Sequence, residues 1–375
     1  MKARCTAPMT APMKGRAVLI MAGGTGGHVF PALAAARVLR ERGYEPVWLG
    51  TRNGMEAKLV PMQQIDIEWI TVGGLRGKGA AAWLGAPFKL SLAIWQSLRV
   101  MRRRRPAAVL GAGGFVSGPG GVAAWLTRRP LVIHEQNAVA GLTNRILARL
   151  ARRVLEAFPA SFPAGVCAER VGNPVRREIV ALAAPAQRYA QRGGPLRLLV
   201  IGGSQGAARL NAVVPAALAM IEASLRPQVI HQAGERHLQQ TLAMYAKHNV
   251  QADVRAFVDD MAEVYSWADL VICRSGALTV SELAAAGLPA ILVPFAAAVD
   301  DHQTLNARFL VDRQAGILLP EKELTPLRLE TELRRLITAG RESLCAMATR
   351  AREDSIIDAD VRLADACIMA AGDAA

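Results

Sequence analysis

The chain has 375 residues, of which 52% are hydrophobic and 20% charged, and it carries a formal net charge of +14. This composition excludes a disordered or fibrous chain and predicts a globular protein with room for two domains of ordinary size. The positive charge favours anionic partners, which are nucleic acid, anionic lipid or a phosphorylated substrate.

The N-terminal residues and the cysteines bear on the cellular compartment in which the protein works. Residues 1–14 contain no secretory segment, and we expect them to form a loose extension in which Met9 and Met13 are alternative starts. The five cysteines are far apart and form no Cys-x-x-Cys pair. The sequence therefore predicts neither a disulfide framework nor a zinc site, and it suits a reducing compartment.

Short apolar runs alternate with helical stretches along the whole chain, which predicts α/β domains built on doubly wound parallel sheets. The first half carries the strands Ala17–Met21, Pro46–Gly50, Ile67–Thr71, Ala108–Gly111, Leu131–His134 and Arg153–Glu156, and helices that include Pro31–Arg42 and Gly141–Leu150. The second half carries the strands Arg197–Ile201, Gln228–Gln232, Asp253–Phe257, Leu270–Cys273, Ala290–Val293 and Gly316–Leu319. We expect two Rossmann-like domains, 15–175 and 176–350, facing a cleft, with a helical tail, 351–375, that packs back on the first domain.

A glycine-rich turn follows the first strand of each half, at Gly23–His28 and at Gly202–Gly206. Such turns place free backbone N–H groups and the positive end of a helix where a phosphate can bind. The first turn is not a dinucleotide-binding fingerprint, because Val29 stands where the third glycine would be required. His28, at the start of the following helix, is therefore a candidate general base rather than a packing residue.

Two further segments carry candidate chemistry. Residues Gly111–Gly121 include six glycines, and a loop of that freedom can open to admit a bulky phosphate-bearing group. Residues Arg274–Glu282 follow a buried strand and begin a helix whose amides can hold a diphosphate, while Glu282 can accept hydrogen bonds from the hydroxyls of a ribose. His302 with its two preceding aspartates lacks a second histidine, so we predict no metal site.

The basic and apolar segment before residue 105 has two readings. Gly85, Pro87 and Lys89 interrupt the apolar stretch Ala80–Leu98, so it is too broken to cross a membrane. An amphipathic helix over Pro87–Arg104 would either pack against a sheet or rest on a membrane surface. The four arginines that end it are either a solvated surface or part of an anion-binding one.

Six motifs occur together and in order: Gly23–Pro31, Gly114–Gly121, His134–Asn137, Gly172–Arg176, Gly202–Ala207 and Gly276–Glu282. With them the chain resembles, from about Arg16 to about Leu319, the MurG family of bacterial N-acetylglucosaminyltransferases. The resemblance implies the two-lobed GT-B glycosyltransferase architecture. It also implies inverting transfer of N-acetylglucosamine from UDP-N-acetylglucosamine (UDP-GlcNAc) to the 4-hydroxyl of undecaprenyl-diphosphate-linked N-acetylmuramoyl pentapeptide, lipid I.

The product of this reaction is lipid II, the precursor of peptidoglycan. The resemblance further implies a metal-independent enzyme without a cofactor, peripheral on the cytoplasmic face of the inner membrane. Its partners would be the two substrates, the anionic leaflet and other cell-wall synthesis proteins, and nucleic acid would not be among them. Two rivals stay open: a UDP-N-acetylglucosamine 2-epimerase, and a scaffold that binds a nucleotide sugar without turnover.

The resemblance also assigns residues, position by position. His28 is the first choice for the base and Glu135 the reserve. The donor contacts are Thr25, Gly26, Gly27, Asn137, Arg176, Ser204, Val258, Ala277, Leu278, Thr279, Val280, Ser281, Glu282 and Gln303. The acceptor diphosphate would lie against Gly24, Gly113, Gly114, Ser117 and Gly118. A membrane face would comprise Arg76, Lys78, Trp83, Leu84, Phe88, Lys89, Trp95 and Trp125.

Overall fold

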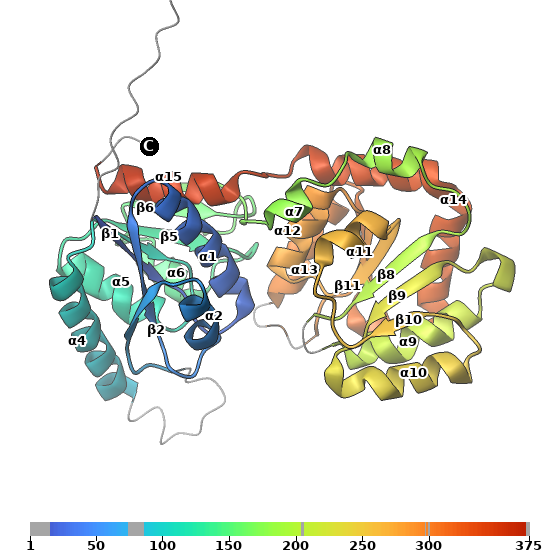
Figure 1. Ribbon diagram of the computed structural model, residues 1–375, viewed down its shortest axis with the longest axis horizontal. Coiled ribbons are helices and arrows are strands. Elements are labelled where there is room, and N and C mark those ends of the chain that lie inside the picture. Colours follow the sequence, from blue (N-terminus) through green and yellow to red (C-terminus); the bar gives the residue numbers. More distant parts are fainter. Residues whose placement is uncertain (1–15, 74–85, 204–205, 297, 299–300, 373–375) are drawn as a thin grey trace, which may run out of the picture.

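The computed structural model describes residues 16–73, 86–203, 206–296, 298 and 301–372. They form two lobes side by side, each a parallel β-sheet with helices on both faces (Figure 1). Ser204, Arg76, Lys78, Trp83 and Leu84, which the sequence assigned to the site or the membrane face, lie outside these residues.

The N-terminal lobe is built on a seven-stranded sheet of order β3-β2-β1-β4-β5-β6-β7. Its strands are β1 (Ala17–Met21), β2 (Glu45–Gly50), β3 (Asp66–Trp69), β4 (Ala108–Gly111), β5 (Leu131–Glu135), β6 (Arg153–Glu156) and β7 (Ala168–Arg170). Its helices are α1 (Gly26–Glu41), α2 (Glu56–Met62), α4 (Ala86–Arg104), α5 (Ser117–Leu126), α6 (Leu142–Leu147) and, from the far end of the chain, α15 (Ala359–Ala370).

The C-terminal lobe repeats this plan on a six-stranded sheet of order β10-β9-β8-β11-β12-β13. Its strands are β8 (Arg197–Ile201), β9 (Gln228–Gln232), β10 (Asp253–Arg255), β11 (Leu270–Cys273), β12 (Ala290–Leu292) and β13 (Gly316–Leu318). Its α-helices are α7 (Arg177–Val180), α8 (Pro185–Ala190), α9 (Ala208–Ala219), α10 (Leu238–Lys247), α11 (Met261–Trp267), α12 (Ala277–Ala286), α13 (His302–Val311) and α14 (Pro326–Glu353). Among its described residues, short 3₁₀ turns lie at η1 (Ala223–Leu225), η2 (Glu235–His237) and η4 (Glu321–Glu323).

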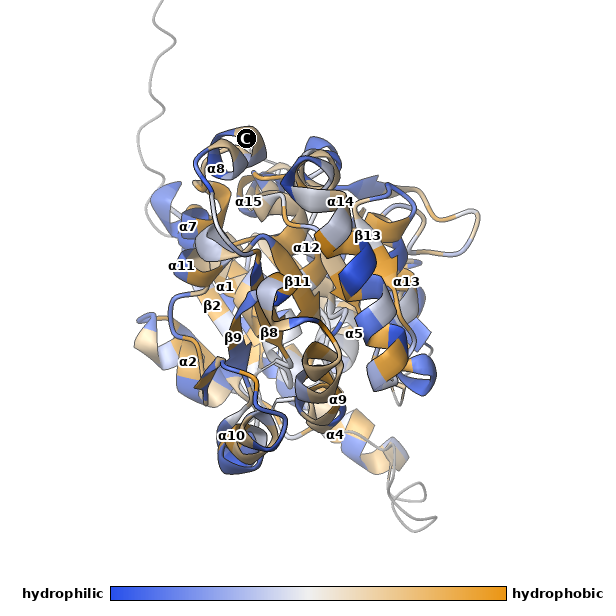
Figure 2. Ribbon diagram, turned by 90° about the vertical axis from the view of Figure 1, so that its right-hand side faces the viewer, coloured by the Kyte–Doolittle hydropathy of each residue, from blue (hydrophilic) through white to orange (hydrophobic). Residues whose placement is uncertain are grey.

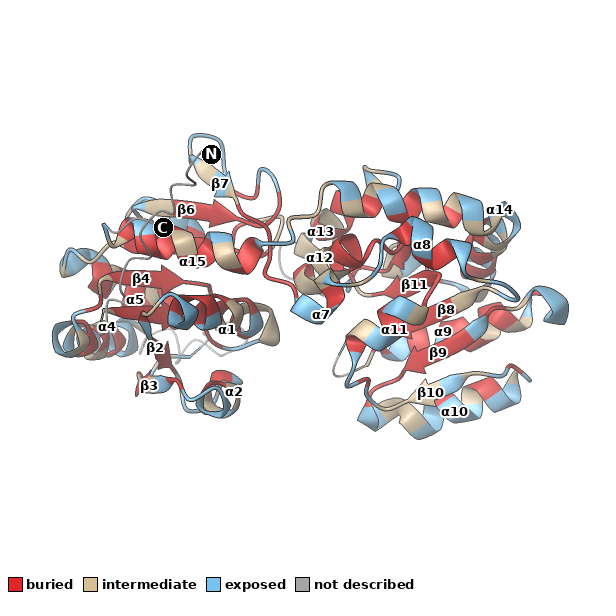
Figure 3. Cartoon of the chain, turned by 45° about the horizontal axis from the view of Figure 1, so that its top comes forward, coloured by how far each residue is buried: buried red, intermediate tan, exposed pale blue. Residues whose placement is uncertain are grey.

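The central strands are short apolar runs because helices cover both faces of each sheet. Strands β1, β4, β5 and β11 are buried at every position. Figure 3 shows the burial of β4 and β11, and Figure 2 shows that β11 is hydrophobic along its length. Parallel strands buried on both faces read as continuous rather than alternating hydrophobic sequence. The predicted fold class, two doubly wound parallel sheets, is confirmed.

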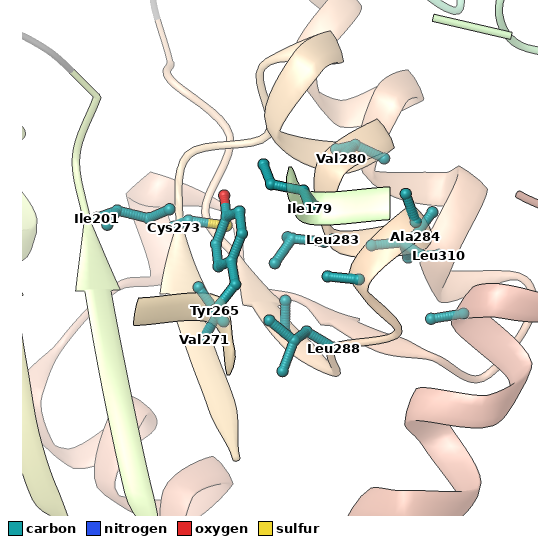
Figure 4. Packing of buried hydrophobic residues seen from close by; sticks show 14 of the residues in the cluster. Ile179, Ile201, Tyr265, Val271, Cys273, Val280, Leu283, Ala284, Leu288 and Leu310 are labelled. Atoms are coloured by element: carbon teal, nitrogen blue, oxygen red, sulfur yellow. The ribbon is translucent and has the colours of Figure 1, made fainter. Parts of the chain in front are cut away.

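A hydrophobic core lies between the C-terminal sheet and the helices α11 and α12. Figure 4 shows Tyr265 of α11 packed among Ile179, Val271 and Cys273, with Leu283 of α12 beside it. Tyr265 is fully buried, and burial raises the pKa of its hydroxyl well above the usual value, so it remains a neutral hydrogen-bond donor. This core supports the first turns of α12 from below.

Two chain segments connect the lobes, residues 171–176 and residues 354–358. Beyond the second connection, α15 packs against α1 of the N-terminal lobe (Figure 1). Its side chains Leu363, Cys367 and Ile368 belong to the same buried cluster as Val29 and Leu39 of α1. The last helix of the chain thus completes the core of the first lobe.

Helix α4 lies on the outside of the N-terminal lobe and turns Ala93, Ser97, Val100 and Met101 inward. Phe88 and Trp95, which the resemblance assigned to the membrane face, are 76% and 52% exposed. At its end Arg104 pairs with Glu68 and Asp66 of β3, and Arg103 also pairs with Glu68. Half of the arginine run is therefore engaged in holding α4 to the sheet edge.

In the described part of the chain, no helix combines the length and the apolar character needed to cross a bilayer.

Candidate active site

Each sheet reverses its strand order at one point, between β1 and β4 in the first lobe and between β8 and β11 in the second. Open α/β sheets bind ligands beside such switch points, at the carboxyl ends of the strands. The glycine turns and the start of α12 lie there: residues 22–27 and 112–117 in the N-terminal lobe, and residues 202–203, 206 and 274–277 in the C-terminal lobe. The fold therefore gathers the predicted phosphate-binding turns at the ends of adjacent strands.

The two glycine segments of the N-terminal lobe pass against each other. Gly24, Gly113 and Gly114 all have positive φ, between +81° and +92°. A methyl group on Gly114 would lie 2.3 Å from the carbonyl oxygen of Gly23, so only glycine permits this approach. Ser117 is fully buried and its hydroxyl lies 2.8 Å from the Gly113 carbonyl oxygen and 3.0 Å from that of Met21, so it holds the two segments together.

A buried carboxylate lies beneath the first turn. Glu56, at the start of α2, is fully buried and accepts hydrogen bonds from the backbone N–H of Gly24 (3.1 Å) and of Thr51 (3.0 Å). The Thr51 hydroxyl donates to it as well, at 2.8 Å. Glu56 thus fixes the shape of the turn from below, a role that the sequence analysis did not assign.

His28 lies in the first turn of α1, half-buried over the second glycine segment. A methyl group on Gly113 would lie 2.7 Å from Nδ1 of His28, so the imidazole packs directly on that glycine. The same nitrogen is 3.0 Å from Oε1 of Gln136, which follows β5. The imidazole is therefore positioned from two sides at the carboxyl end of the sheet.

Glu135, at the end of β5, is buried and surrounded by donors. Its carboxylate accepts from the backbone N–H of Asn137 (3.0 Å) and of Gly141 (3.1 Å). The side-chain amide of Asn144 donates to it at 2.9 Å, and that of Asn137 at 3.3 Å. In this structure the carboxylate fastens the loop that carries Asn137.

In the C-terminal lobe, α12 begins at Ala277 and leaves the amides of its first turn without helical partners, as every helix does. Glu282 lies one turn further along, with Oε1 at 3.4 Å from Nε of Arg176 and Oε2 accepting from the Tyr265 hydroxyl at 3.2 Å. Burial raises the pKa of Glu282, although Arg176 and the Tyr265 hydrogen bond oppose that shift. Arg176 and Tyr265 thus hold the carboxylate close to the helix N-terminus, although its burial removes water that would stabilise the charge.

The remaining candidate donor contacts lie around this helix start. The Val258 side chain is buried in the core, so only its main chain is available to a ligand. Gln303, in the first turn of α13, accepts from the backbone N–H of Phe295 at 2.9 Å. In the turn after β8, a methyl group on Gly206 would lie 2.0 Å from the Ala233 carbonyl oxygen, so that position also requires glycine.

The two lobes meet through buried amide side chains. Asn306 of α13 accepts from the backbone N–H of Ala138 at 2.8 Å, and its own amide lies 3.3 Å from Oδ1 of Asn137. Asn173, in the first inter-lobe connection, donates to the Gln136 carbonyl (3.0 Å) and to the Ser281 hydroxyl (3.1 Å). Asn306 was not predicted as a site residue, because its only sequence signal is a polar residue in an otherwise buried helix face.

Two facing sheets of the Rossmann type, each with glycine turns at its switch point, define the GT-B class of glycosyltransferases. Residues 18–156 match the glycosyltransferase family 28 N-terminal domain, and residues 197–363 match the C-terminal domain of that family. The chain belongs to glycosyltransferase family 28 and, within it, to the MurG family.

Relatives support this assignment over nearly the whole chain. A protein of Nitrosococcus oceani, named UDP-N-acetylglucosamine–N-acetylmuramyl-(pentapeptide) pyrophosphoryl-undecaprenol N-acetylglucosamine transferase, is 56% identical over 94% of this chain and 98% of its own length. A protein of the same name from Alkalilimnicola ehrlichii is 58% identical, with the same coverage. The crystal structure of MurG from Acinetobacter baumannii superposes with a TM-score of 0.84, at 42% identity over 94% of this chain and 99% of that one.

Proposed function

We propose that this chain transfers N-acetylglucosamine from UDP-GlcNAc to lipid I and so forms lipid II in peptidoglycan synthesis. The observation that carries the proposal is the pair of glycine-lined switch points, one per lobe, in a chain 56% identical to a named transferase of this reaction. The epimerase and scaffold readings are not favoured, because relatives this similar over their full length carry the transferase name.

The donor binds to the C-terminal lobe. The free amides at the start of α12, from Ala277, Leu278 and Thr279, together with Ser204, hold the diphosphate, because a helix N-terminus attracts negative charge. Val280 completes this turn, and its own N–H donates to the Gly276 carbonyl at 3.0 Å. Glu282 accepts hydrogen bonds from the ribose hydroxyls, the main chain of Val258 lies against the uracil, and Ser281, Gln303 and Asn137 surround the sugar. Two further parts complete the donor site: Arg176, from the first inter-lobe connection, and Thr25, Gly26 and Gly27, from the N-terminal lobe.

The chemistry is one in-line displacement at the anomeric carbon. The acceptor 4-hydroxyl attacks the anomeric carbon as it loses its proton, and the bond from that carbon to the diphosphate oxygen breaks. UDP leaves, and the configuration at the anomeric carbon is inverted in the product. The amides at the start of α12 and the guanidinium of Arg176 stabilise the charge that develops on the departing diphosphate.

His28 takes the proton of the acceptor hydroxyl. Its imidazole lies between the two glycine segments and is held by Gln136, whereas the Glu135 carboxylate is already occupied by donors from Asn137, Gly141 and Asn144. A general base must reach the proton that it removes, and a carboxylate saturated by structural hydrogen bonds is poorly suited to do so. This contrast favours His28 over Glu135.

The acceptor diphosphate lies against the glycine segments of the N-terminal lobe, at Gly24, Gly113, Gly114 and Gly118. Positive φ at Gly113 and Gly114 turns the backbone so that their N–H groups can face an anion, whereas the Gly24 N–H already donates to the Glu56 carboxylate at 3.1 Å. Ser117 contributes by fixing the segment rather than by a free hydroxyl, since its hydroxyl already donates to main-chain carbonyls.

The outer face of α4 and α5 rests on the anionic cytoplasmic leaflet of the inner membrane. Phe88, Trp95 and Trp125 are each more than half exposed, and Lys89 is exposed beside Phe88. Aromatic side chains partition into the bilayer interface, and each cation near an anionic surface contributes about 1 kcal/mol. The resemblance assigns Arg76, Lys78, Trp83 and Leu84 to the membrane face as well, and these four lie outside the described residues.

Transfer of radiolabelled N-acetylglucosamine from UDP to a lipid I analogue, with and without EDTA, tests the reaction. We expect label in the lipid product under both conditions, and loss of at least 100-fold in kcat for His28→Ala with little change in the KM for UDP-GlcNAc. Conversion of UDP-GlcNAc without acceptor would support the epimerase instead, and binding without any turnover would support the scaffold.

Sedimentation with vesicles tests the membrane face separately. We expect binding to rise with the fraction of anionic lipid and to fall in a Phe88→Ser, Trp95→Ser double variant. A matched substitution of Met220, which is exposed on the other lobe, should leave vesicle binding unchanged. Equal binding by the wild type and the double variant would refute the proposed face.

A further inference from the structure

A chain of hydrogen bonds runs from His28 into the interior of the N-terminal lobe. Nδ1 of His28 lies 3.0 Å from Oε1 of Gln136, and Nε2 of Gln136 lies 3.1 Å from Nδ1 of His134. Nε2 of His134 lies 2.9 Å from the carbonyl oxygen of Gly172, in the first inter-lobe connection. Three side chains thus join α1, the end of β5 and the segment between the lobes.

The Gly172 carbonyl, at the inner end of this series of hydrogen bonds, determines which group donates and which accepts in each of them. A carbonyl oxygen only accepts, so Nε2 of His134 carries the proton that it donates to Gly172. In a neutral imidazole the other nitrogen, Nδ1, is then an acceptor, and the side-chain NH₂ of Gln136 donates to it. The amide oxygen of Gln136 consequently faces His28 and accepts from a protonated Nδ1.

His134 accepts through Nδ1 only while its imidazole is neutral, and its surroundings keep it neutral. His134 is completely buried, and burial lowers its pKa to about 4, with the Gly172 carbonyl opposing the shift and the charge on His28 adding to it. Near pH 7 the imidazole therefore carries one proton, on Nε2. The main chain of Gln136 is also held in place, because its backbone carbonyl accepts from the Asn173 side chain at 3.0 Å. The side-chain amide of Gln136 therefore extends from a fixed backbone position.

We propose that Gln136 and His134 are positioning residues that hold His28 in the Nδ1–H tautomer and so leave the lone pair of Nε2 to accept the proton of the sugar hydroxyl. The inference rests on the proposed function of His28 as the base. Neither Gln136 nor His134 is assigned to contact a substrate. Without the amide oxygen, either nitrogen of His28 could carry the proton, and the tautomer protonated on Nε2 cannot act as the base through that atom.

The first experiment measures the tautomers in the full-length wild-type protein, by long-range ¹H–¹⁵N correlation of ¹⁵N-histidine-labelled enzyme near pH 7.5. The signals of His28 and His134 are identified by their loss in His28→Ala and His134→Ala. We expect His28 protonated on Nδ1 and His134 protonated on Nε2. The opposite tautomer at either position would overturn the proposal without any variant of Gln136.

The second experiment changes Gln136 in two ways. Gln136→Met retains the length of the side chain but neither donates nor accepts strongly, and we expect mixed His28 tautomers with kcat lowered about 10- to 100-fold and the KM for UDP-GlcNAc within threefold. Gln136→Glu retains an acceptor toward His28, so the Nδ1–H tautomer and part of kcat should be preserved relative to Gln136→Met. An unchanged tautomer in Gln136→Met would refute the role of Gln136.

A matched control separates positioning from loosening of the strand end. Asn144→Leu removes an amide that donates to the His134 carbonyl and to Glu135 but does not touch His28. We expect it to lower stability while leaving the His28 tautomer unchanged, and a changed tautomer there would argue that general loosening is sufficient. If the tautomers are as proposed but His28→Ala retains near-normal turnover, the catalytic part of the proposal and the proposed role of His28 fail together, while the hydrogen-bond assignment holds.

Discussion

Asn306 and Asn137 lie 3.3 Å apart, one from each lobe, with the amide of Asn306 donating to the side-chain oxygen of Asn137. Asn306 also accepts from the backbone N–H of Ala138 and donates to the Ser275 carbonyl at 3.2 Å. One fully buried side chain therefore joins the loop after β5 to the loop that begins α12. Both of these loops carry proposed donor contacts.

Replacing Asn306 should loosen this junction. Asn306→Ala leaves the Ala138 N–H without its partner, and an unsatisfied buried group costs about 1–3 kcal/mol. We expect a lower melting temperature and a higher KM for UDP-GlcNAc with a smaller change in kcat. Arg308→Ala, on an exposed position of the same helix, is the control. If the two variants had equal donor KM values, the contact would have no part in donor binding.

Glu282→Gln should separate stability from function. The raised pKa of Glu282 means that its contribution to stability falls as pH rises from the unfolded-state value toward the raised folded-state value. The neutral amide avoids this loss, so we expect the variant to melt at the same temperature as the wild type or higher at pH 8, and to lose this advantage below about pH 4.5.

The same variant should bind the donor less tightly, since hydrogen bonds to a charged acceptor contribute about 1.5–3 kcal/mol. We expect a rise of about 10- to 100-fold in the KM for UDP-GlcNAc. Glu263→Gln, an exposed carboxylate of α11, is the matched control for both measurements. A Glu282→Gln protein that melts below the wild type at pH 8 would contradict the burial argument.

Glu56 should control the acceptor side of the site. Glu56→Ala removes the acceptor for the Gly24 and Thr51 N–H groups, and we expect the free energy of unfolding to fall by about 2–4 kcal/mol. The KM for the lipid I analogue should rise, because the turn loses its support, whereas the KM for UDP-GlcNAc should change less. Urea unfolding and initial rates measure the two effects, with the exposed Lys58→Ala on the same helix as control. An unchanged acceptor KM would mean that the turn keeps its shape without the carboxylate.

The contribution of α15 to the stability of the first lobe can be measured by truncating one buried side chain, Leu363. Leu363 is fully buried against α1, and Leu363→Ala should lower the free energy of unfolding by about 2–5 kcal/mol. Met369→Ala, half exposed on the same helix, should cost much less. UDP binding to the native protein should remain close to normal in both variants, and a similar loss of stability in both would show that α15 is not packed as described.

The strands were predictable because each central one is a run of residues buried on both faces and ended by glycine or a polar residue. Strands β1, β4, β8 and β11 have the predicted boundaries. Strand β7 was missed, because none of its three residues is fully buried and two of them are charged, so it lacks an apolar signal. Helix α1 begins at Gly26 rather than at the predicted Pro31, because Gly26 and Gly27 resemble a turn in sequence but adopt helical backbone here.

Contacts between segments that are far apart in the sequence were harder to predict. Glycine-rich segments such as residues 23–27 can be recognised from local composition, and so can the helix start at Ala277. The Asn306–Asn137 contact joins residues 169 positions apart, and the support of Gly24 by Glu56 spans 32 positions. Local periodicity carries no information on such pairs, so Asn306, Glu56 and the orientation of Gln136 emerge only from the folded chain.

The packing of α15 on α1 also bears on how the molecule is made. Translation produces α15 only after the whole C-terminal lobe, so the first lobe leaves the ribosome with the part of its core that α15 covers still exposed. Domains usually fold in the order of their synthesis, but here the earlier one must wait for the later one to be completed before its last helix arrives. A gene divided between the two sheets would therefore yield an amino-terminal half with an exposed apolar groove, prone to aggregation until the final helix is supplied.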